Sequence, residues 1–357
     1  MHVENFLIMN NSVFNPNDIG RPNGNYFGLP YTFDEADIAL ISVPWDVTTS
    51  YASGTVHGPH SIIDASVQLD LFDFDVKDSW KIRIGSTELI LAEENSRLRE
   101  MAEEVIAYLE DGGAVGDKKI AKQLVQINDG SDRLNNIVYQ QAKNLLNKNK
   151  IPAVIGGEHS VPFGLIKAIG EKYPDTGILH IDAHADLRNS YEGFIYSHAS
   201  IMYNVLHKCE GISKLVQVGI RDLSEGEMQL VSDDTRVVMF NDFTLKEAEY
   251  TGKTWSKQCD EIIANLPQNV YVSFDIDGLS PENCPNTGTP VPGGLSFNQA
   301  VYLLKRLAMS GRKIVGFDLC EVTPGSSGEW DANVGARILY KLCCYTHLSN
   351  NCKETNY

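Results

Sequence analysis

The chain has 357 residues, of which 43% are hydrophobic and 22% charged, a composition typical of a soluble globular protein with a large core. Its formal net charge of −17 offers no basic surface for nucleic acid. An acidic surface favours the approach of a cationic substrate, or serves solubility alone.

No apolar run reaches the ~18–20 residues of a membrane-spanning helix, and the start MHVENFLIMNNSVFNPND lacks a signal peptide's basic and apolar regions. Seven scattered cysteines without a CxxC pair suit a reducing compartment. We therefore expect a cytoplasmic protein.

Short apolar runs alternate with amphipathic helical patterns along the chain. The runs predict strands at Ile38–Val43, Ala153–Ile155, Ile178–Ile181, Leu215–Val218, Val237–Phe240, Val270–Phe274 and Ile314–Phe317. Several do not alternate polar with apolar residues, which is typical of strands covered on both faces. Helical spacing follows at Leu134–Leu146 and at Phe297–Ala308, where Ser296 and Gln299 form a capping-box pattern. The pattern predicts an α/β fold with one mostly parallel sheet between two layers of helices.

We expect a single domain over residues 1–357, with residues 1–36 as an N-terminal extension. Residues 88–131 are rich in Glu, Asp, Lys and Gly and interrupt the early strands. They are predicted to form a helical insertion, with a charged helix at about Asn95–Leu109 and a loop at Asp111–Lys119.

Four segments carry residues suited to chemistry, and three of them directly follow a predicted strand. These are AVIGGEHS with His159; HIDAHAD with Asp182, His184 and Asp186; YVSFDIDGLSP with Asp275 and Asp277; and IVGFDLCEVTPG with Glu321. Ligands of open α/β sheets bind beyond the carboxyl ends of the strands, so these segments are expected to meet.

Each segment alone has a simpler explanation. His159 could cap a helix, DAHAD could be a polar network at a strand end, and Glu321 could be a solvated loop acid. The DIDGLSPENCPN segment resembles a calcium loop, but its sixth and twelfth residues are Ser280 and Asn286, where such a loop needs Gly and Glu. The calcium interpretation fails.

Together the segments predict a site for two metal ions. Four aspartates at the ends of two buried strands would repel one another without a cation. Asp182 and Asp186 would lie ~13 Å apart on a continuous strand, so the chain must curl after His184 for both to reach one pair of ions. Two imidazoles and four carboxylates favour Mn²⁺, with Ni²⁺ or Co²⁺ also admissible.

At these residues the chain resembles the ureohydrolases, the arginase–agmatinase family of binuclear manganese enzymes. The resemblance covers about residues 38–345 and includes VPWDVTTSY, GGEHS, HIDAHADLR, SHAS, SFDIDGLSP, TGTPVPGG and FDLCEVTP. It implies a three-layer α/β/α sandwich with a central sheet of about eight strands. It also implies assembly into homotrimers or homohexamers.

The resemblance also implies a role for each motif residue. One ion would be held by His159, Asp182, Asp186 and Asp275, and the other by His184, Asp182, Asp275 and Asp277. His198 in SHAS would transfer protons, and Glu321 would pair with the guanidinium group. A hydroxide shared by two Mn²⁺ or Ni²⁺ ions would attack the guanidinium carbon, Asp186 would orient it, and urea would be released.

Departures from the arginase pattern bear on the substrate. After HAD, an arginase has a turn that reads the α-carboxylate, whereas this chain has Leu187 and Arg188. The segment SSGEWDANVGARILYKLC with Trp330 resembles a branch that cleaves free guanidine. We expect a small cationic substrate, agmatine or free guanidine, with Arg188 and Trp330 as candidate substrate-binding residues. His57 and His60 stay without an assigned role.

Three alternatives remain. The first is hydrolysis of formimidoylglutamate or a guanidino acid, in which Arg188 would bind a carboxylate. The second is arginase activity itself. The third is a metal-free, inactive homologue with a structural or regulatory role.

Overall fold

A sheet of eight parallel strands forms the centre of the computed structural model, which describes residues 7–9, 12–325 and 328–351. The strands lie in the order β4-β3-β5-β10-β9-β6-β7-β8. Their bounds are β3 Ile38–Val43, β4 Ile84–Glu88, β5 Ile151–Gly156, β6 Thr176–Ile181, β7 Ile212–Val218, β8 Val237–Phe240, β9 Asn269–Asp275 and β10 Lys313–Cys320.

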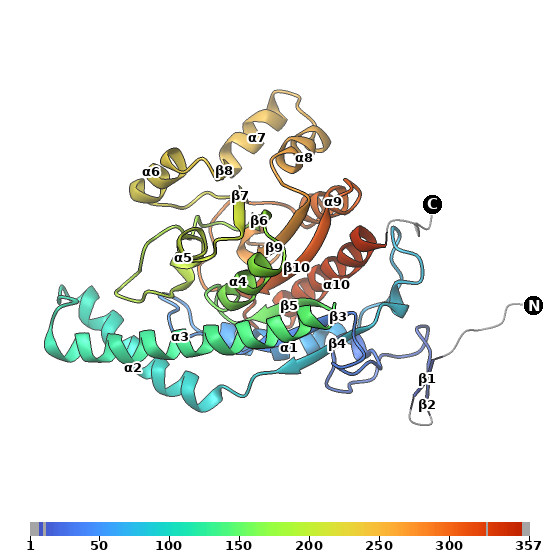
Figure 1. The fold of residues 1–357 in the computed structure, drawn as a ribbon, viewed down its shortest axis with the longest axis horizontal. Coiled ribbons are helices and arrows are strands. Elements are labelled where there is room, and N and C mark those ends of the chain that lie inside the picture. Colours follow the sequence, from blue (N-terminus) through green and yellow to red (C-terminus); the bar gives the residue numbers. More distant parts are fainter. Residues whose placement is uncertain (1–6, 10–11, 326–327, 352–357) are drawn as a thin grey trace, which may run out of the picture.

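Helices cover both faces of this sheet and create two separate cores (Figure 1). Alternate residues of a strand point to opposite faces, so Ile38 and Leu40 of β3 enter one core while Ala39 and Ile41 enter the other. The first core contains residues of the helices at 58–66, 242–250, 255–264, 297–308 and 330–350, and the second contains residues of the helices at 92–110, 118–147, 163–172 and 201–208. The predicted three-layer sandwich is confirmed.

The helices follow the strands along the chain. They are α1 Gly58–Ser66, α2 Ala92–Glu110, α3 Lys118–Asn147, α4 Phe163–Lys172, α5 Ile201–Lys208, α6 Glu225–Asp233, α7 Asp242–Tyr250, α8 Trp255–Ala264, α9 Phe297–Ala308 and α10 Trp330–Asn350. At α9 the predicted capping box is present, since Gln299 N donates to Ser296 Oγ and Ser296 N donates to Gln299 Oε1.

All seven predicted strands are present, but β4 was not predicted, and α3 begins well before the predicted helix at Leu134–Leu146. Strand β4 has the sequence IGSTE, with too few apolar residues to stand out. Helix α3 begins at Lys118 and continues through Asp129, Gly130 and Ser131, a run typical of a loop. Gly130 allows α2 and α3 to pack closely, because a side chain at this position would collide with Leu98 of α2. This close packing offsets the low helix propensity of glycine. The segment 88–131 is therefore mostly a pair of helices.

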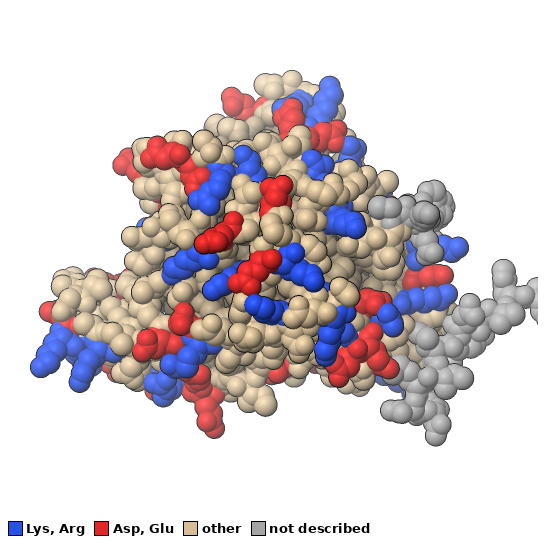
Figure 2. All heavy atoms as spheres, viewed as in Figure 1, with Lys and Arg blue, Asp and Glu red and all other residues tan. Residues whose placement is uncertain are grey.

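The N-terminal residues form a small antiparallel pair, β1 Leu7–Met9 and β2 Ser12–Phe14, apart from the main sheet (Figure 1). Residues 1–6 of the expected extension, Ser326 and Ser327 of the SSGEWDANVGARILYKLC segment, and Cys352 lie outside the described residues. Over the described ranges, every helix is too short or too polar to span a membrane. Figure 2 shows basic and acidic side chains interspersed over one face of the molecule.

Close packing of α3 against α4 depends on Gly164, and Gly164→Ala is expected to lower the free energy of unfolding by ~1–3 kcal/mol. A Cβ at this position would lie 2.2 Å from the backbone oxygen of Asn135 in α3, so the helices would have to move apart. Gly226→Ala in α6 is the matched control, because a Cβ there meets nothing within 4 Å. Urea denaturation of both variants checks this, and equal midpoints would contradict it.

Candidate functional site

The sheet order places the ends of four strands side by side at the centre of one edge. These are β5, β10, β9 and β6, which are adjacent in this order. The chain leaves β5 toward His159, and Asp182 directly follows β6. Asp275 is the last residue of β9, and Glu321 follows the end of β10. The four predicted segments, distant in the sequence, are thereby brought together.

Asp182 lies between two groups of ligand atoms. Its Oδ2 is 3.0 Å from His159 Nδ1, and its Oδ1 is 3.5 Å from His184 Nδ1. The same nitrogen of His159 is 3.2 Å from Asp186 Oδ2 and 3.3 Å from Asp275 Oδ2. On the other side, His184 Nδ1 is 3.1 Å from Asp277 Oδ2. All six predicted ligands therefore converge, and Asp182 lies in contact with both groups.

The chain curls after His184, as the convergence requires. Strand β6 ends at Ile181, and Asp186 has a φ of 55°, in the left-handed region. The carbonyl oxygen of Asp186 accepts hydrogen bonds of 3.1 Å from the amides of Met202 and Tyr203 at the start of α5. These bonds hold a backbone conformation that is uncommon for Asp, at the point where the three ligands are folded onto one side.

The cluster holds more negative charge than its own histidines neutralise. Burial, and then the charges of Asp277 and Asp182, raise the pKa of Asp275 well above its usual range. Burial and the Asp182 charge raise the pKa of Asp186 to about 6. Burial lowers the pKa of His184, but the carboxylates of Asp277 and Asp182 outweigh it and raise that pKa to about 12. Divalent cations would supply the missing positive charge, so the residues fit a metal centre rich in oxygen ligands.

Further buried polar residues orient two of these predicted ligands, His159 and Asp182. His159 Nε2 is 2.9 Å from Ser273 Oγ, and Ser273 Oγ donates to Asp318 Oδ2 at 2.8 Å. Asp318 also accepts from the hydroxyl of Tyr271 at 2.7 Å. His180 Nε2 is 2.8 Å from Asp182 Oδ2. Partners of this kind fix the orientation of a ligating imidazole or carboxylate.

No role was predicted for these residues, although the sequence contains a signal for them. Ser273 and Asp318 are polar residues within runs otherwise suited to buried strands, YVSFD and GFDLC. His180 likewise interrupts the run before Asp182. A fully buried polar side chain in a strand requires a hydrogen-bond partner, which points to a network.

A cavity of about 170 Å³ lies over the cluster. It is lined by Ser50, His184, Asp186, Arg188, Tyr191, His198, Ala199, Asp222, Leu223, Glu227 and Thr289. Ligand pockets for drug-sized molecules begin at ~300 Å³, so this cavity suits a small molecule. The acidic residues Asp222 and Glu227 were not predicted; they come from the loop after β7 and from α6.

His198 lies at the cavity between two loops. Its backbone N–H donates to Thr48 Oγ1 at 3.3 Å, and its Nε2 is 3.4 Å from Ser50 Oγ. The ring meets Tyr191 edge to face, with centroids 6.3 Å apart. Burial, and then the positive charge of His184, lower the pKa of His198 to about 4. The imidazole is therefore neutral near pH 7.

Arg188 reaches the cavity with its charge already compensated. Its Nε is 3.6 Å from Glu227 Oε2, and its guanidinium carbon lies 4.9 Å from the centre of the Tyr191 ring. Glu227 itself accepts hydrogen bonds from the amides of Leu187 and Ser224. Arg188 is thus fixed at the side of the cavity by an ion pair and a cation–π contact.

Glu321 is not among the residues that line this cavity; it directly follows β10 and has a backbone φ of 64°. Its Oε1 accepts a 2.7 Å hydrogen bond from the amide of His159. The carboxylate is buried, and burial together with the charge of Glu158 raises its pKa well above the usual range. A buried carboxylate of this kind favours a positively charged partner.

The other candidates lie elsewhere. Trp330 does not line the cavity over the cluster; it is 54% exposed, and its Nε1 donates to the backbone oxygen of Glu282. The resemblance predicted that Trp330 would bind the substrate. In the structure it is the first residue of α10 and lies outside the loops that line the cavity. His57 and His60 are exposed at the start of α1 and line a separate surface hollow.

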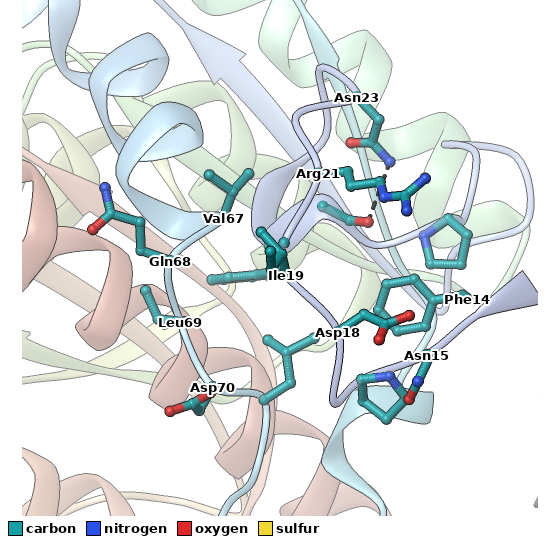
Figure 3. A pocket seen from close by; sticks show the side chains of 16 residues that line it. Phe14, Asn15, Asp18, Ile19, Arg21, Asn23, Val67, Gln68, Leu69 and Asp70 are labelled. Atoms are coloured by element: carbon teal, nitrogen blue, oxygen red, sulfur yellow. Dashed lines mark hydrogen bonds between the residues drawn. The ribbon is translucent and has the colours of Figure 1, made fainter.

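A larger hollow of about 720 Å³ lies away from the cluster (Figure 3). It is lined by the N-terminal segment, including Phe14 and Ile19, and by the chain after α1, including Val67 and Leu69. Among the described residues, the groups suited to holding a metal ion all lie at the strand ends instead. The chemistry is therefore assigned to the smaller cavity.

Known proteins resemble this chain over most of its length. The model of the Arginase family matches residues 36–344. An N(1)-aminopropylagmatine ureohydrolase of Thermus thermophilus is 30% identical over 311 residues, 86% of this chain and 89% of that protein. An agmatinase of Bacillus cereus is 30% identical over 295 residues, with coverages of 82% and 86%. The structure of proclavaminate amidino hydrolase from Streptomyces clavuligerus has the same fold, with a TM-score of 0.71 at 23% identity and coverages of 93% and 99%.

Proposed function

Because this chain belongs to the arginase family of ureohydrolases, we propose that it is a binuclear-metal hydrolase that releases urea from a small cationic guanidino compound. The observation that carries this proposal is Asp182, whose two carboxylate oxygens face two different groups of ligand atoms. A carboxylate in this position is suited to bridge two ions.

The residues fit two divalent ions. His159, Asp182, Asp186 and Asp275 would hold one, and His184, Asp182, Asp275 and Asp277 the other. Oxygen-rich coordination favours Mn²⁺, with Ni²⁺ as the second candidate. Such a pair of ions lowers the pKa of water so that a hydroxide is available near neutral pH.

The protein's own groups would orient the substrate and move protons. Glu321 would attract the guanidinium group toward the cluster. Burial and the charge of Glu158 disfavour its ionised form, and a bound cation would stabilise that form. Asp186 would accept a hydrogen bond from the attacking water, with its orientation fixed by the backbone bonds to α5. His198 would accept a proton at Nε2 and pass it to the leaving nitrogen.

Charge at the cavity favours an agmatine-type substrate, a guanidinium group with a distal amine. Asp222 is an exposed carboxylate at the cavity and can pair with that amine. Arg188 would repel the amine only weakly, because Glu227 neutralises it. The relatives named for agmatine and aminopropylagmatine support this choice. The volume of about 170 Å³ favours free guanidine as the second candidate. We further propose a cytoplasmic homotrimer or homohexamer, which light scattering would test.

A panel of substrates tests the proposal. Agmatine is expected to exceed arginine by at least ~10²-fold in kcat/KM, because the α-carboxylate of arginine would lie near Asp222, and the nearby Arg188 is already paired with Glu227. Urea release is measured from agmatine, guanidine, guanidinobutyrate and arginine, with the enzyme loaded separately with Mn²⁺ and Ni²⁺. Asp222→Asn should lower kcat/KM for agmatine and leave that for guanidine unchanged.

Other outcomes of the panel would revise the assignment. Fastest release from arginine would contradict a substrate without a carboxylate. Fastest release from guanidinobutyrate would make Arg188 a carboxylate clamp. An absence of urea from all four compounds with both metals would reject the function itself.

A further inference from the structure

The helices α2 and α3 form a hairpin that reaches out beyond the sheet (Figure 1), and its inner side contacts both loops at His198. We infer that this hairpin positions His198 by holding these two loops, so that Arg99 and Asn128 are positioning residues for the reaction. The inference rests on the proposed function, which assigns proton transfer to His198.

The first loop follows β3 and is held by α2. Arg99 donates from Nη1 to three backbone oxygens of this loop, those of Asp46, Val47 and Thr49. Its side chain is only 14% exposed, although it carries a charge. Asn95, one turn earlier, exchanges two hydrogen bonds with Asp46: the backbone amide of Asp46 donates at 2.9 Å, and Asn95 Nδ2 donates to Oδ1 at 3.0 Å.

The second loop follows β6 and is held by α3. The side-chain amide of Asn128 donates to the backbone oxygen of Gly193 at 3.1 Å and accepts from the amide of Ile195 at 2.8 Å. A single side chain thus satisfies two backbone groups of an irregular segment. Gly193 has a φ of 84°, and a side chain there would collide with Leu124 of α3. The loop therefore fits the helix closely.

The two loops meet at His198. Thr48 and Ser50 come from the loop held by Arg99, and they contact the backbone amide and Nε2 of His198. Tyr191 comes from the loop held by Asn128, and its ring packs edge to face on the imidazole. Arg99 and Asn128 make no contact with His198, so their effect on it must be transmitted through these loops.

The hairpin is stiff enough to transmit such a constraint. Leu98 of α2 packs directly on Gly130 of α3, and α3, which is thirty residues long, packs against Gly164 of α4 at Asn135. An error of ~1 Å in the place of a catalytic group can cost ~10²-fold in rate. Small displacements of either loop should therefore be visible in turnover.

Asn128→Ala is the direct test, in the full chain loaded with Mn²⁺. We expect kcat for agmatine to fall by ~10–100-fold while KM and the metal content stay unchanged. Hydrogen exchange should become faster in residues 189–197. Asn136→Ala is the matched control, because its side chain bonds only to Asp132 in its own helix. Arg99→Met should lower kcat in the same way by loosening the loop after β3, and hydrogen exchange should become faster in residues 44–54.

A double-variant cycle separates positioning from general damage. If Asn128 acts through His198, then Asn128→Ala should have no further effect on kcat in a His198→Ala background. An undiminished second loss, a loss of metal, or wild-type kcat with unchanged exchange would each overturn the inference. Failure of the proposed function is seen separately, as a wild-type enzyme that releases no urea.

Discussion

Replacing Asp182 by Asn is expected to abolish both metal loading and urea release, with activity falling by more than ~10²-fold. The two oxygens of this carboxylate face His159 on one side and His184 on the other, and Oδ2 is also fixed by His180. An amide has one acceptor oxygen and no charge, so it cannot serve both sides. The measurement is metal analysis of the purified variant beside its kinetics.

Asp129→Asn provides the control for this variant, because Asp129 is an exposed carboxylate on α3. It should retain full metal and full activity. If Asp182→Asn also bound two ions per chain and kept its activity, the assignment of Asp182 as the shared ligand would be wrong.

Replacing His198 by Ala is expected to lower kcat by ~10²–10⁴-fold while leaving the metals bound, since His198 is proposed as an acid–base group and not as a ligand. It contacts Thr48 and Ser50 and lines the cavity. Steady-state kinetics and metal content are measured on the same preparation.

His207→Ala is the matched control for His198, because this exposed histidine of α5 stacks on Tyr203. Its kcat should equal that of the wild type. Loss of metal from His198→Ala would instead make His198 a ligand, and unchanged kcat would exclude proton transfer by this residue.

The convergence of the proposed ligands could be predicted from the sequence because it follows from a few rules of sheet geometry. Parallel strands end at one edge of a sheet, so Asp182 and Asp275 were expected near each other as soon as β6 and β9 were recognised as strands. The turn that brings Asp186 back also followed, since a continuous strand would hold it too far from Asp182.

The walls of the cavity could not be predicted in this way. Asp222 and Glu227 reach it from a loop and a helix whose positions depend on the packing of the whole edge, and no local pattern marks them. The pairing of Arg188 with Glu227 requires the same long-range information. Trp330 was expected to bind the substrate only because its segment resembles that of other proteins. In the structure its side chain is absent from the cavity lining and bonds to the backbone oxygen of Glu282.

The central claim is that the strand-end cluster holds two divalent ions that act together on a guanidino cation. Its most direct test is a titration of the metal-free full chain with Mn²⁺, with bound metal and urea release from agmatine measured at each step. The account predicts two ions bound per chain and activity that appears only as the second one binds. Full urea release from a chain that holds one ion, or none, would contradict it.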